Sequence, residues 1–278
     1  MKKINRRSFL AAAGLTAAAL ALTACGGSAS STASSTASSA ASSEAASTSA
    51  TAELTTVEAG KLTMATNAAF PPYEMTTDAG EFEGIDVDTA KAIAEKLGLE
   101  LQIDDMDFDA ALLSVQQGKA DIVMAGVTVT DERKAVMDFS DSYATGIQSI
   151  IVPNDSDIAS PDDLAGKTIG TQRGTTGYIY CSDDFGDENV VAYDDGLTAV
   201  QALNNGQVDA VVIDNAPAQE FVAANPGLKV LDTSYAEEDY AIGMAKGSAL
   251  EDAVNKALEE LKADGTLQAI VDKYINAN

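Results

Sequence analysis

The chain has 278 residues, with 43 Asp and Glu against 17 Lys and Arg, so its formal net charge is −26. An acidic chain of this kind is not expected to bind nucleic acid. It contains no His and only two Cys. These counts argue against a zinc site and remove the usual catalytic base, so we expect no metal and no other cofactor.

The first 25 residues have the layout of a secretory signal. Four cations precede an apolar run over residues 10–24, and this run is shorter than the roughly 20 residues that span a bilayer. At its end, Leu22-Thr-Ala-Cys25 resembles a lipobox, in which the Cys becomes the lipid-linked N-terminus. We therefore expect an exported protein held at the outer face of the cell membrane through Cys25, with an unmodified Cys as the alternative. Arg6-Arg7-Ser-Phe-Leu also resembles a twin-arginine signal, which leaves the export route open.

A stretch rich in Ser, Ala and Thr follows over residues 26–58. It lacks the large apolar side chains whose burial offsets the entropy cost of ordering, so we interpret it as a flexible tether. A coil of this length has an end-to-end distance near ~30 Å. Because Cys25 is assigned to lipid, Cys181 has no second Cys for an intrachain disulfide.

The next segments predict a strand followed by a helix. Residues 61–66 alternate apolar and polar side chains, as a half-buried strand does. Apolar residues then recur at helical spacing from Val87 to Leu97, before Gly98, a frequent helix end. This succession indicates an α/β fold.

Two pairs of segments repeat each other farther along the chain. Residues 115–124 are echoed by residues 203–212, each with a helix end, a Gly and a buried strand that Asp precedes. Residues 60–67 are echoed more loosely by residues 166–172. Two echoes in the same order predict two similar α/β lobes.

The last part of the chain predicts one strand over residues 240–245 and two helices. Apolar residues from Leu250 to Leu261 mark an amphipathic helix that ends at Gly265, and residues 267–274 mark the last one. Ligands of open α/β sheets bind outside the carboxyl ends of the strands. In this chain those ends are expected at residues 67–73, 125–133, 170–177 and 214–217.

Four motifs resemble the polar amino acid family of solute-binding proteins, and the resemblance covers about residues 60–276. It implies an α/β two-lobe clamshell of the periplasmic-binding-protein type II, each lobe a mixed sheet flanked by helices, with a two-strand hinge. Lobe 1 would comprise residues 59–147 and 241–278, and lobe 2 residues 148–240. The motifs are Ala65-Thr-Asn-Ala-Ala-Phe-Pro-Pro-Tyr-Glu74, Gly84-Ile-Asp-Val-Asp88, Ala125-Gly-Val-Thr-Val-Thr-Asp-Glu-Arg133 and Asp138-Phe-Ser-Asp141.

The resemblance assigns the charged ends of an amino acid ligand to two residues. Arg133 matches the residue that binds the α-carboxylate, which suits the planar fork of a guanidinium. Asp214 matches the acceptor of the α-ammonium. The alternatives are a solvated Arg in a first helical turn and a helix N-cap, although Asp214 could serve both roles.

Other pocket positions also follow from the resemblance. Backbone and hydroxyl groups of the ligand site correspond to Ala125, Gly126, Thr128 and Thr175. Phe70 and Phe108 match aromatic walls, with a plain core role as the alternative, and Tyr73 is a lesser candidate.

Asn67 and Gln172 are expected to contact the variable end of the ligand. Relatives that take basic amino acids often have an acid at the position of Asn67, so this neutral amide favours a neutral polar ligand, glutamine first. A basic amino acid or cystine is the alternative, because Glu74, Glu83 and Asp107 lie close enough in sequence to supply a negative charge.

The predicted function is therefore capture of a free L-amino acid for the permease subunits of an ABC importer, by a monomer that is not an enzyme. An enzyme on the same clamshell, dehydratase-like, is the main rival, because a fold does not fix a function. It would need an additional acid or base aimed at the reacting atom. The Gly-rich segment 170–177 does not have the spacing of a dinucleotide fingerprint.

Overall fold

The computed structural model describes residues 54–275. The signal segment, the lipobox Cys25, most of the predicted tether and residues 276–278 lie outside the described residues. From Leu54 on, the chain contacts the first lobe: Leu54 packs against its apolar core and the Val57 N–H donates to Asp121 Oδ1 at 2.7 Å. None of the helices in the described part is long and apolar enough to cross a membrane.

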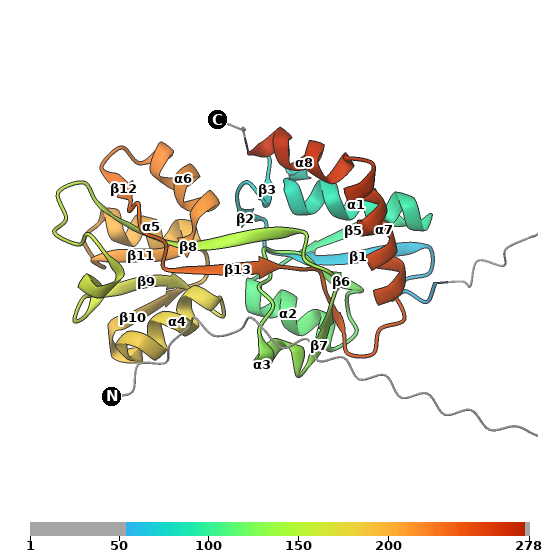
Figure 1. The fold of residues 1–278 in the computed structure, drawn as a ribbon, viewed down its shortest axis with the longest axis horizontal. Coiled ribbons are helices and arrows are strands. Elements are labelled where there is room, and N and C mark those ends of the chain that lie inside the picture. Colours follow the sequence, from blue (N-terminus) through green and yellow to red (C-terminus); the bar gives the residue numbers. More distant parts are fainter. Residues whose placement is uncertain (1–53, 276–278) are drawn as a thin grey trace, which may run out of the picture. The chain divides into compact units, whose positions relative to one another are not determined.

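The first lobe contains a mixed sheet in the order β5-β1-β6-β14-β7 (Figure 1). Strands β5 and β6 are parallel to β1, whereas β14 is antiparallel to β6 and β7. The strands are β1 (Lys61–Thr66), β5 (Glu100–Asp105), β6 (Ile122–Val123), β7 (Met137–Phe139) and β14 (Gly243–Ala245). The helices are α1 (Ile85–Leu97), α2 (Phe108–Gln116), α3 (Asp131–Lys134), α7 (Glu251–Ala263) and α8 (Thr266–Tyr274).

The alternation of side chains along β1 explains how this sheet is covered on both faces. Leu62 and Met64 point into a core cluster shared with α1, α7 and α8, whereas Ala65 points into a second cluster shared with α2. Figure 1 accordingly shows α1 and α2 on opposite sides of the sheet. The predicted strand over residues 61–66 and the predicted helix that ends before Gly98 are both confirmed.

The second lobe contains a sheet in the order β10-β9-β11-β8-β12, and β13 also pairs with β8. Its strands are β8 (Ala144–Pro153), β9 (Ile169–Gln172), β10 (Val190–Tyr193), β11 (Ala210–Asp214), β12 (Leu228–Val230) and β13 (Ala236–Tyr240). Its helices are α4 (Thr176–Phe185), α5 (Gly196–Asn204) and α6 (Asn215–Ala224), with short 3₁₀ turns at Pro161–Leu164 and Asp187–Asn189. A small separate sheet consists of β2 (Ala69–Phe70), β3 (Glu74–Thr76) and β4 (Phe82–Glu83).

The predicted repeat between the lobes has a structural counterpart. The Thr63 N–H donates to Asp121 Oδ2 at 2.8 Å, and the Thr168 N–H donates to Asp209 Oδ2 at 2.7 Å. In each lobe an Asp just before one parallel strand thus accepts from a backbone N–H within or directly before the neighbouring strand, β1 or β9. Asp121 and Asp209 therefore make equivalent hydrogen bonds in two similar lobes, as the two sequence repeats predict.

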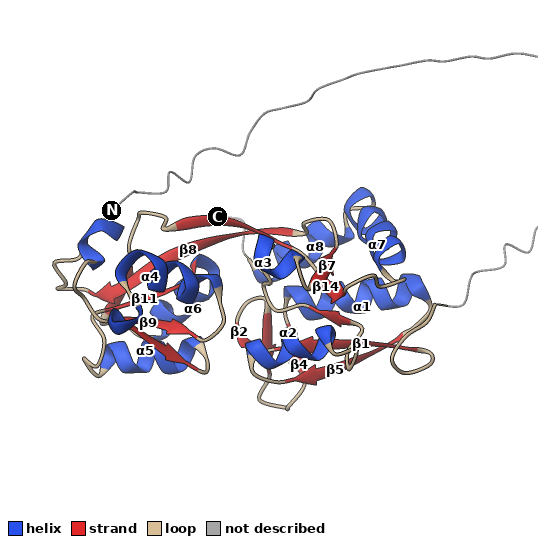
Figure 2. Cartoon of the chain, turned by 90° about the horizontal axis from the view of Figure 1, so that it is seen from below, coloured by secondary structure: helices blue, strands red, loops and turns tan. Residues whose placement is uncertain are grey.

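Strands β8 and β13 form the hinge. They pair antiparallel from Ala144 opposite Tyr240 to Gln148 opposite Ala236, and β8 continues from one lobe into the other in both views (Figure 1, Figure 2). The α/β two-lobe clamshell with a two-strand hinge is therefore confirmed. The lobe boundaries expected at residues 147 and 148 fall inside β8.

The strand predicted over residues 240–245 is confirmed for β14, but its start is wrong, because Tyr240 ends β13 and β14 begins only at Gly243. Between them the chain leaves the hinge and enters the sheet of the first lobe. The Ala241 N–H donates to the Val127 carbonyl at 3.1 Å, and the Ile242 N–H donates to Ser140 Oγ at 3.0 Å. These bonds replace the ladder bonds that a continuous strand would make.

Candidate ligand-binding site

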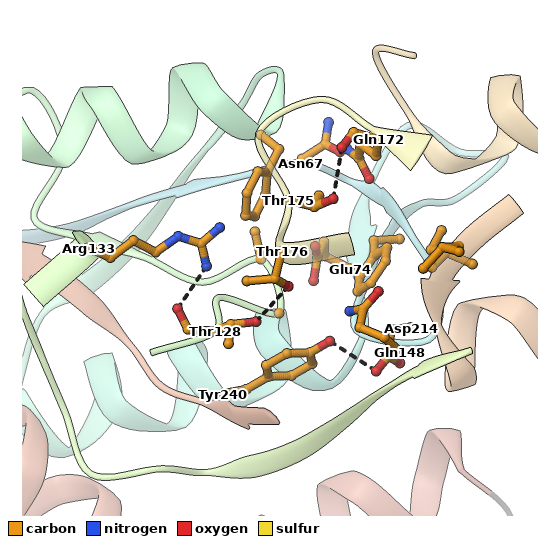
Figure 3. Close-up of a pocket in the computed structure, with 16 residues that line it drawn as sticks. Asn67, Glu74, Thr128, Arg133, Gln148, Gln172, Thr175, Thr176, Asp214 and Tyr240 are labelled. Atoms are coloured by element: carbon orange, nitrogen blue, oxygen red, sulfur yellow. Dashed lines mark hydrogen bonds between the residues drawn. The ribbon is translucent and has the colours of Figure 1, made fainter. Parts of the chain in front are cut away.

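One pocket brings together all ten residues that the sequence analysis assigned to ligand binding (Figure 3). They come from both lobes and lie at or just after the carboxyl ends of β1, β6, β9 and β11, or on α2, α3 and the small sheet. Their contact with a ligand remains a prediction. The ten residues are Asn67, Phe70, Phe108, Ala125, Gly126, Thr128, Arg133, Gln172, Thr175 and Asp214.

Arg133 is buried, with 9% of its surface exposed, so the alternative of a solvated surface Arg is wrong. Its Nη1 donates to the Thr128 carbonyl at 2.8 Å and its Nη2 donates to the Gly174 carbonyl of the other lobe at 3.1 Å. The guanidinium carbon lies 5.4 Å from the centre of the Phe108 ring. Burial lowers the pKa of Arg133, and the negative charge of Glu238 opposes this shift.

Asp214 is 2% exposed and has the geometry of both roles proposed for it. Its Oδ1 accepts from the Ala216 N–H at 3.0 Å, which caps α6. Its Oδ2 accepts from the Ile147 N–H at 2.8 Å and from the Tyr240 hydroxyl at 3.0 Å. Burial raises the pKa of Asp214 to about 6, because no cation neutralises the carboxylate within the described part of the chain.

The two amides expected at the variable end of the ligand bond to each other across the lobes. Gln172 Nε2 donates to Asn67 Oδ1 at 2.8 Å and to the Asp194 carbonyl at 3.3 Å. Asn67 Nδ2 donates to the Met106 carbonyl at 3.0 Å. Most of the amide N–H groups are thereby occupied, so this end of the pocket offers acceptors rather than donors.

Glu74 is the third charged residue that lines the pocket. It is 1% exposed, and its hydrogen-bond partner among residues 54–275 is a second buried acid, Asp86, since no N–H or hydroxyl group there donates to it. Burial, and then the nearby Asp86 carboxylate, raise the pKa of Glu74 well above its ordinary value. Of the three acids considered for a basic ligand, only Glu74 lines this pocket, because Glu83 and Asp107 lie outside it.

Aromatic rings lie in the wall of the pocket and directly behind it. The Phe70 and Tyr73 rings stack with centroids 5.7 Å apart, and Tyr73 meets Tyr240 edge-on at 5.5 Å. Phe108 is 5% exposed, lines the pocket and also packs in the core cluster around α2, so the core role is confirmed and the contact with a ligand stays a prediction. Tyr73 itself is buried and does not line the pocket.

Several lining residues were not predicted from the sequence. Tyr240 and Gln148 lie on the hinge strands and Thr176 begins α4. Thr176 lies within residues 170–177, where the sequence predicted a strand end, whereas the sequence Ala236-Glu-Glu-Asp-Tyr240 has no apolar alternation that would indicate an inward Tyr240. The unpredicted lining residues are Gln148, Thr176, Val212, Ile213 and Tyr240.

This fold, with a pocket between two lobes at the carboxyl ends of their strands, defines a solute-binding protein of the clamshell class. The model of the bacterial extracellular solute-binding proteins, family 3, matches residues 62–277, and the chain belongs to this family.

Relatives with known binding roles are solute-binding proteins and not enzymes. The L-cystine-binding protein TcyJ of Escherichia coli K12 is 33% identical over 80% of this chain and 85% of its own length. The arginine-binding extracellular protein ArtP of Bacillus subtilis 168 is 34% identical over 77% of this chain and 86% of its own.

Solved structures agree with this assignment. The arginine-, lysine-, histidine-binding protein ArtJ of Geobacillus stearothermophilus has a TM-score of 0.75 at 35% identity, over 78% of this chain and 96% of that one. An ancestral arginine-binding protein bound to glutamine has a TM-score of 0.74 at 42% identity, over 78% of this chain and 98% of that one.

Asp86 supports the pocket from behind and makes its stability depend on pH. It is fully buried, and its Oδ2 accepts from the Gly126 N–H at 3.0 Å while its Oδ1 accepts from the Tyr143 hydroxyl at 2.7 Å. Burial raises the pKa of Asp86 to about 6, although hydrogen bonds with Gly126, Tyr143 and Glu74 oppose this increase. Its folded pKa therefore lies above the ordinary value of 3.8.

We predict that Asp86→Asn flattens the pH dependence of folding. Because the folded chain holds the Asp86 proton more tightly than the unfolded chain does, protonation of Asp86 stabilises the folded protein. This stabilisation is complete below the ordinary pKa and is lost as the pH rises through 6. From pH 7 to pH 5, Asp86 should add about 1 kcal/mol to the free energy of unfolding, and the variant should lack this gain. Urea denaturation at both pH values measures it, with Asp78→Asn in an exposed loop as the control. An equal gain in Asp86→Asn and the wild type would contradict the assignment.

Proposed function

We propose that this chain is the substrate-binding component of an ABC importer that captures one free L-amino acid between its lobes and delivers it to the permease. The observation that carries the proposal is the pair Arg133 and Asp214, two oppositely charged side chains that approach one pocket from opposite sides (Figure 3). A free amino acid carries the complementary pair of charges on adjacent positions. Catalysis on this fold would need an additional group aimed at a reacting atom, and neither of these residues is such a group.

The proposed contacts with the α-carboxylate and the α-ammonium, which all free amino acids have in common, follow from the geometry. Arg133 would hold the α-carboxylate through two parallel hydrogen bonds, with Thr175 beside it from the other lobe. Asp214 would accept the α-ammonium, since its Oδ1 has one protein donor and can take another. Ala125, Gly126 and Thr128 would supply further contacts, and Phe70 and Phe108 would enclose the ligand side chain.

For the variable end, we infer an L-amino acid with a cationic side chain, L-arginine first. Glu74 supports this choice, because its buried carboxyl is paired with a second acid, Asp86, and a cationic ligand group would stabilise its ionised form. Asn67 and Gln172 have few N–H groups left for a neutral amide ligand. Relatives that bind arginine support the same inference. Glutamine, which the sequence favours, is the rival ligand, and one ancestral relative was solved with it.

The remaining proposals concern the whole chain. Residues 1–25 would act as a lipoprotein signal, residues 26–58 as the tether, and the lobes would follow the boundaries given above, in a monomer. Fatty-acid labelling should mark the wild type and miss Cys25→Ala, because the thioether needs the Cys sulfur. Equal labelling of both proteins would exclude lipidation at Cys25.

Arg133→Ala should weaken binding of L-arginine by on the order of 10² to 10³, because removing one partner of a buried charge pair costs roughly 3 to 5 kcal/mol. Arg133→Lys should recover part of the loss, since an ammonium keeps the charge without the bidentate fork. Isothermal titration calorimetry on protein freed of co-purified ligand measures both. Arg173→Ala is the matched control, because Arg173 lies in the neighbouring loop and is half exposed. Binding by Arg133→Ala within threefold of the wild type would exclude this role.

Glu74 should make binding of L-arginine, but not of L-glutamine, release a proton. Its raised pKa falls when a cation reaches it, so a proton leaves as the guanidinium arrives. Calorimetry near pH 6, in two buffers of different ionisation enthalpy, measures how many protons are released on binding of each ligand. Glu74→Gln should abolish the difference in proton release between the two ligands and weaken L-arginine about tenfold or more. Glu83→Gln is the control, because Glu83 lies in the same small sheet but outside the pocket. It should change neither the proton release nor the affinity for L-arginine. Tighter binding of L-glutamine than of L-arginine by the wild type would reverse the ligand assignment.

A further inference from the structure

A buried acid in the hinge lies outside the pocket lining described above. In β13, Glu237 and Asp239 are exposed, whereas Glu238 is 6% exposed and Tyr240 is 1% exposed. Successive side chains of a strand point to opposite faces, so Glu238 shares the inward face with Tyr240. A carboxylate is unusual there, because burial of a charge is costly without compensation.

The contacts of Glu238 connect the hinge to the pocket. Its Oε2 accepts from the Thr128 hydroxyl at 3.0 Å and from Gln148 Nε2 at 3.0 Å. Its other oxygen is buried without a hydrogen-bond partner in the described part of the chain. The negative charge of Glu238 also opposes the lowering of the Arg133 pKa that burial causes. Both residues that donate to Glu238 line the pocket.

The Thr128 hydroxyl also meets the hydroxyl of Thr176, at 3.3 Å, across the two lobes (Figure 3). A hydroxyl has one hydrogen, and a carboxylate accepts without donating. Because Thr128 donates its hydrogen to Glu238, Thr176 must be the donor in the bond to Thr128. The chain of bonds therefore runs in one direction, from Thr176 in lobe 2 through Thr128 in lobe 1 to Glu238 in the hinge.

We propose that Glu238 is a positioning residue for ligand binding: it fixes this direction so that the Thr128 hydroxyl presents an acceptor lone pair to the ligand α-ammonium. The same contact ties the hinge strand to both lobes in the arrangement that encloses the ligand. Without the carboxylate, the Thr128 hydroxyl is free to turn its hydrogen toward the ammonium and repel it. This inference rests on the proposed function, because it requires an α-ammonium in the pocket.

A double-mutant cycle on the full chain tests the proposal, with L-arginine and L-glutamine as the probes. Glu238→Met removes the acceptor at similar volume and should weaken the tighter-binding probe about tenfold or more. Glu238→Gln retains one acceptor oxygen and should restore part of the affinity. In a Thr128→Val background, Glu238→Met should have little further effect, because the hydroxyl it orients is gone. Glu237→Met is the matched control, since that neighbouring acid faces outward.

The outcomes separate this proposal from the proposed function. If the wild type binds neither probe nor any other L-amino acid, both are overturned. If it binds and Glu238→Met resembles Glu237→Met, only the role of Glu238 is overturned. An equal loss with and without the Thr128 hydroxyl also overturns it, because a purely structural acid would act in both backgrounds. If Glu238→Met lowers the unfolding midpoint of the ligand-free protein, Glu238→Gln replaces it in the cycle. The affinity loss is again compared with and without the Thr128 hydroxyl, and an equal loss overturns the proposal.

Discussion

A single guanidinium buried between two lobes is the constraint on which the rest of the site depends. Arg133 forms no ion pair with the carboxylates of residues 54–275, and its charge is held by the carbonyls of Thr128 and Gly174, by the Phe108 ring and by the field of Glu238. Each lobe supplies one of the two carbonyls. Neutral acceptors compensate a charge less well than a carboxylate does, so the guanidinium retains the capacity to bind an anion. In the proposed function, ligand recognition and contact between the lobes would thus involve the same side chain.

The buried acids of the site lack cationic partners in the described part of the chain, just as Arg133 lacks a carboxylate partner there. Asp214 and Glu74 are both buried in the pocket wall, and burial raises the pKa of each. Asp214 accepts from three neutral donors, whereas the partner of Glu74 within the described residues is another acid, Asp86. Two acids and one base together match a ligand that carries two positive charges and one negative charge better than they match a neutral zwitterion. This balance supports the proposal of a cationic amino acid as the ligand in place of glutamine.

Much of the fold follows from local sequence patterns, and the rest depends on contacts between distant residues. Periodicity located β1 and α1, and the repeated Asp of each lobe indicated the common architecture. Family motifs identified the ten residues that meet in one pocket. The break between β13 and β14 could not be predicted, because residues 240–245 keep a strand-like pattern while the chain passes between sheets. The bond between Asn67 and Gln172 could not be predicted either, because it joins residues 105 positions apart, and it occupies N–H groups that the prediction of glutamine had left for the ligand.

A structure of the protein with L-arginine bound tests the central claim most directly. The account predicts the ligand carboxylate in a two-bond contact with Arg133, its α-ammonium within hydrogen-bond distance of Asp214 and the Thr128 hydroxyl, and its guanidinium against Glu74. A ligand in the reverse orientation, with its α-carboxylate away from Arg133, or one bound outside this pocket, would contradict it.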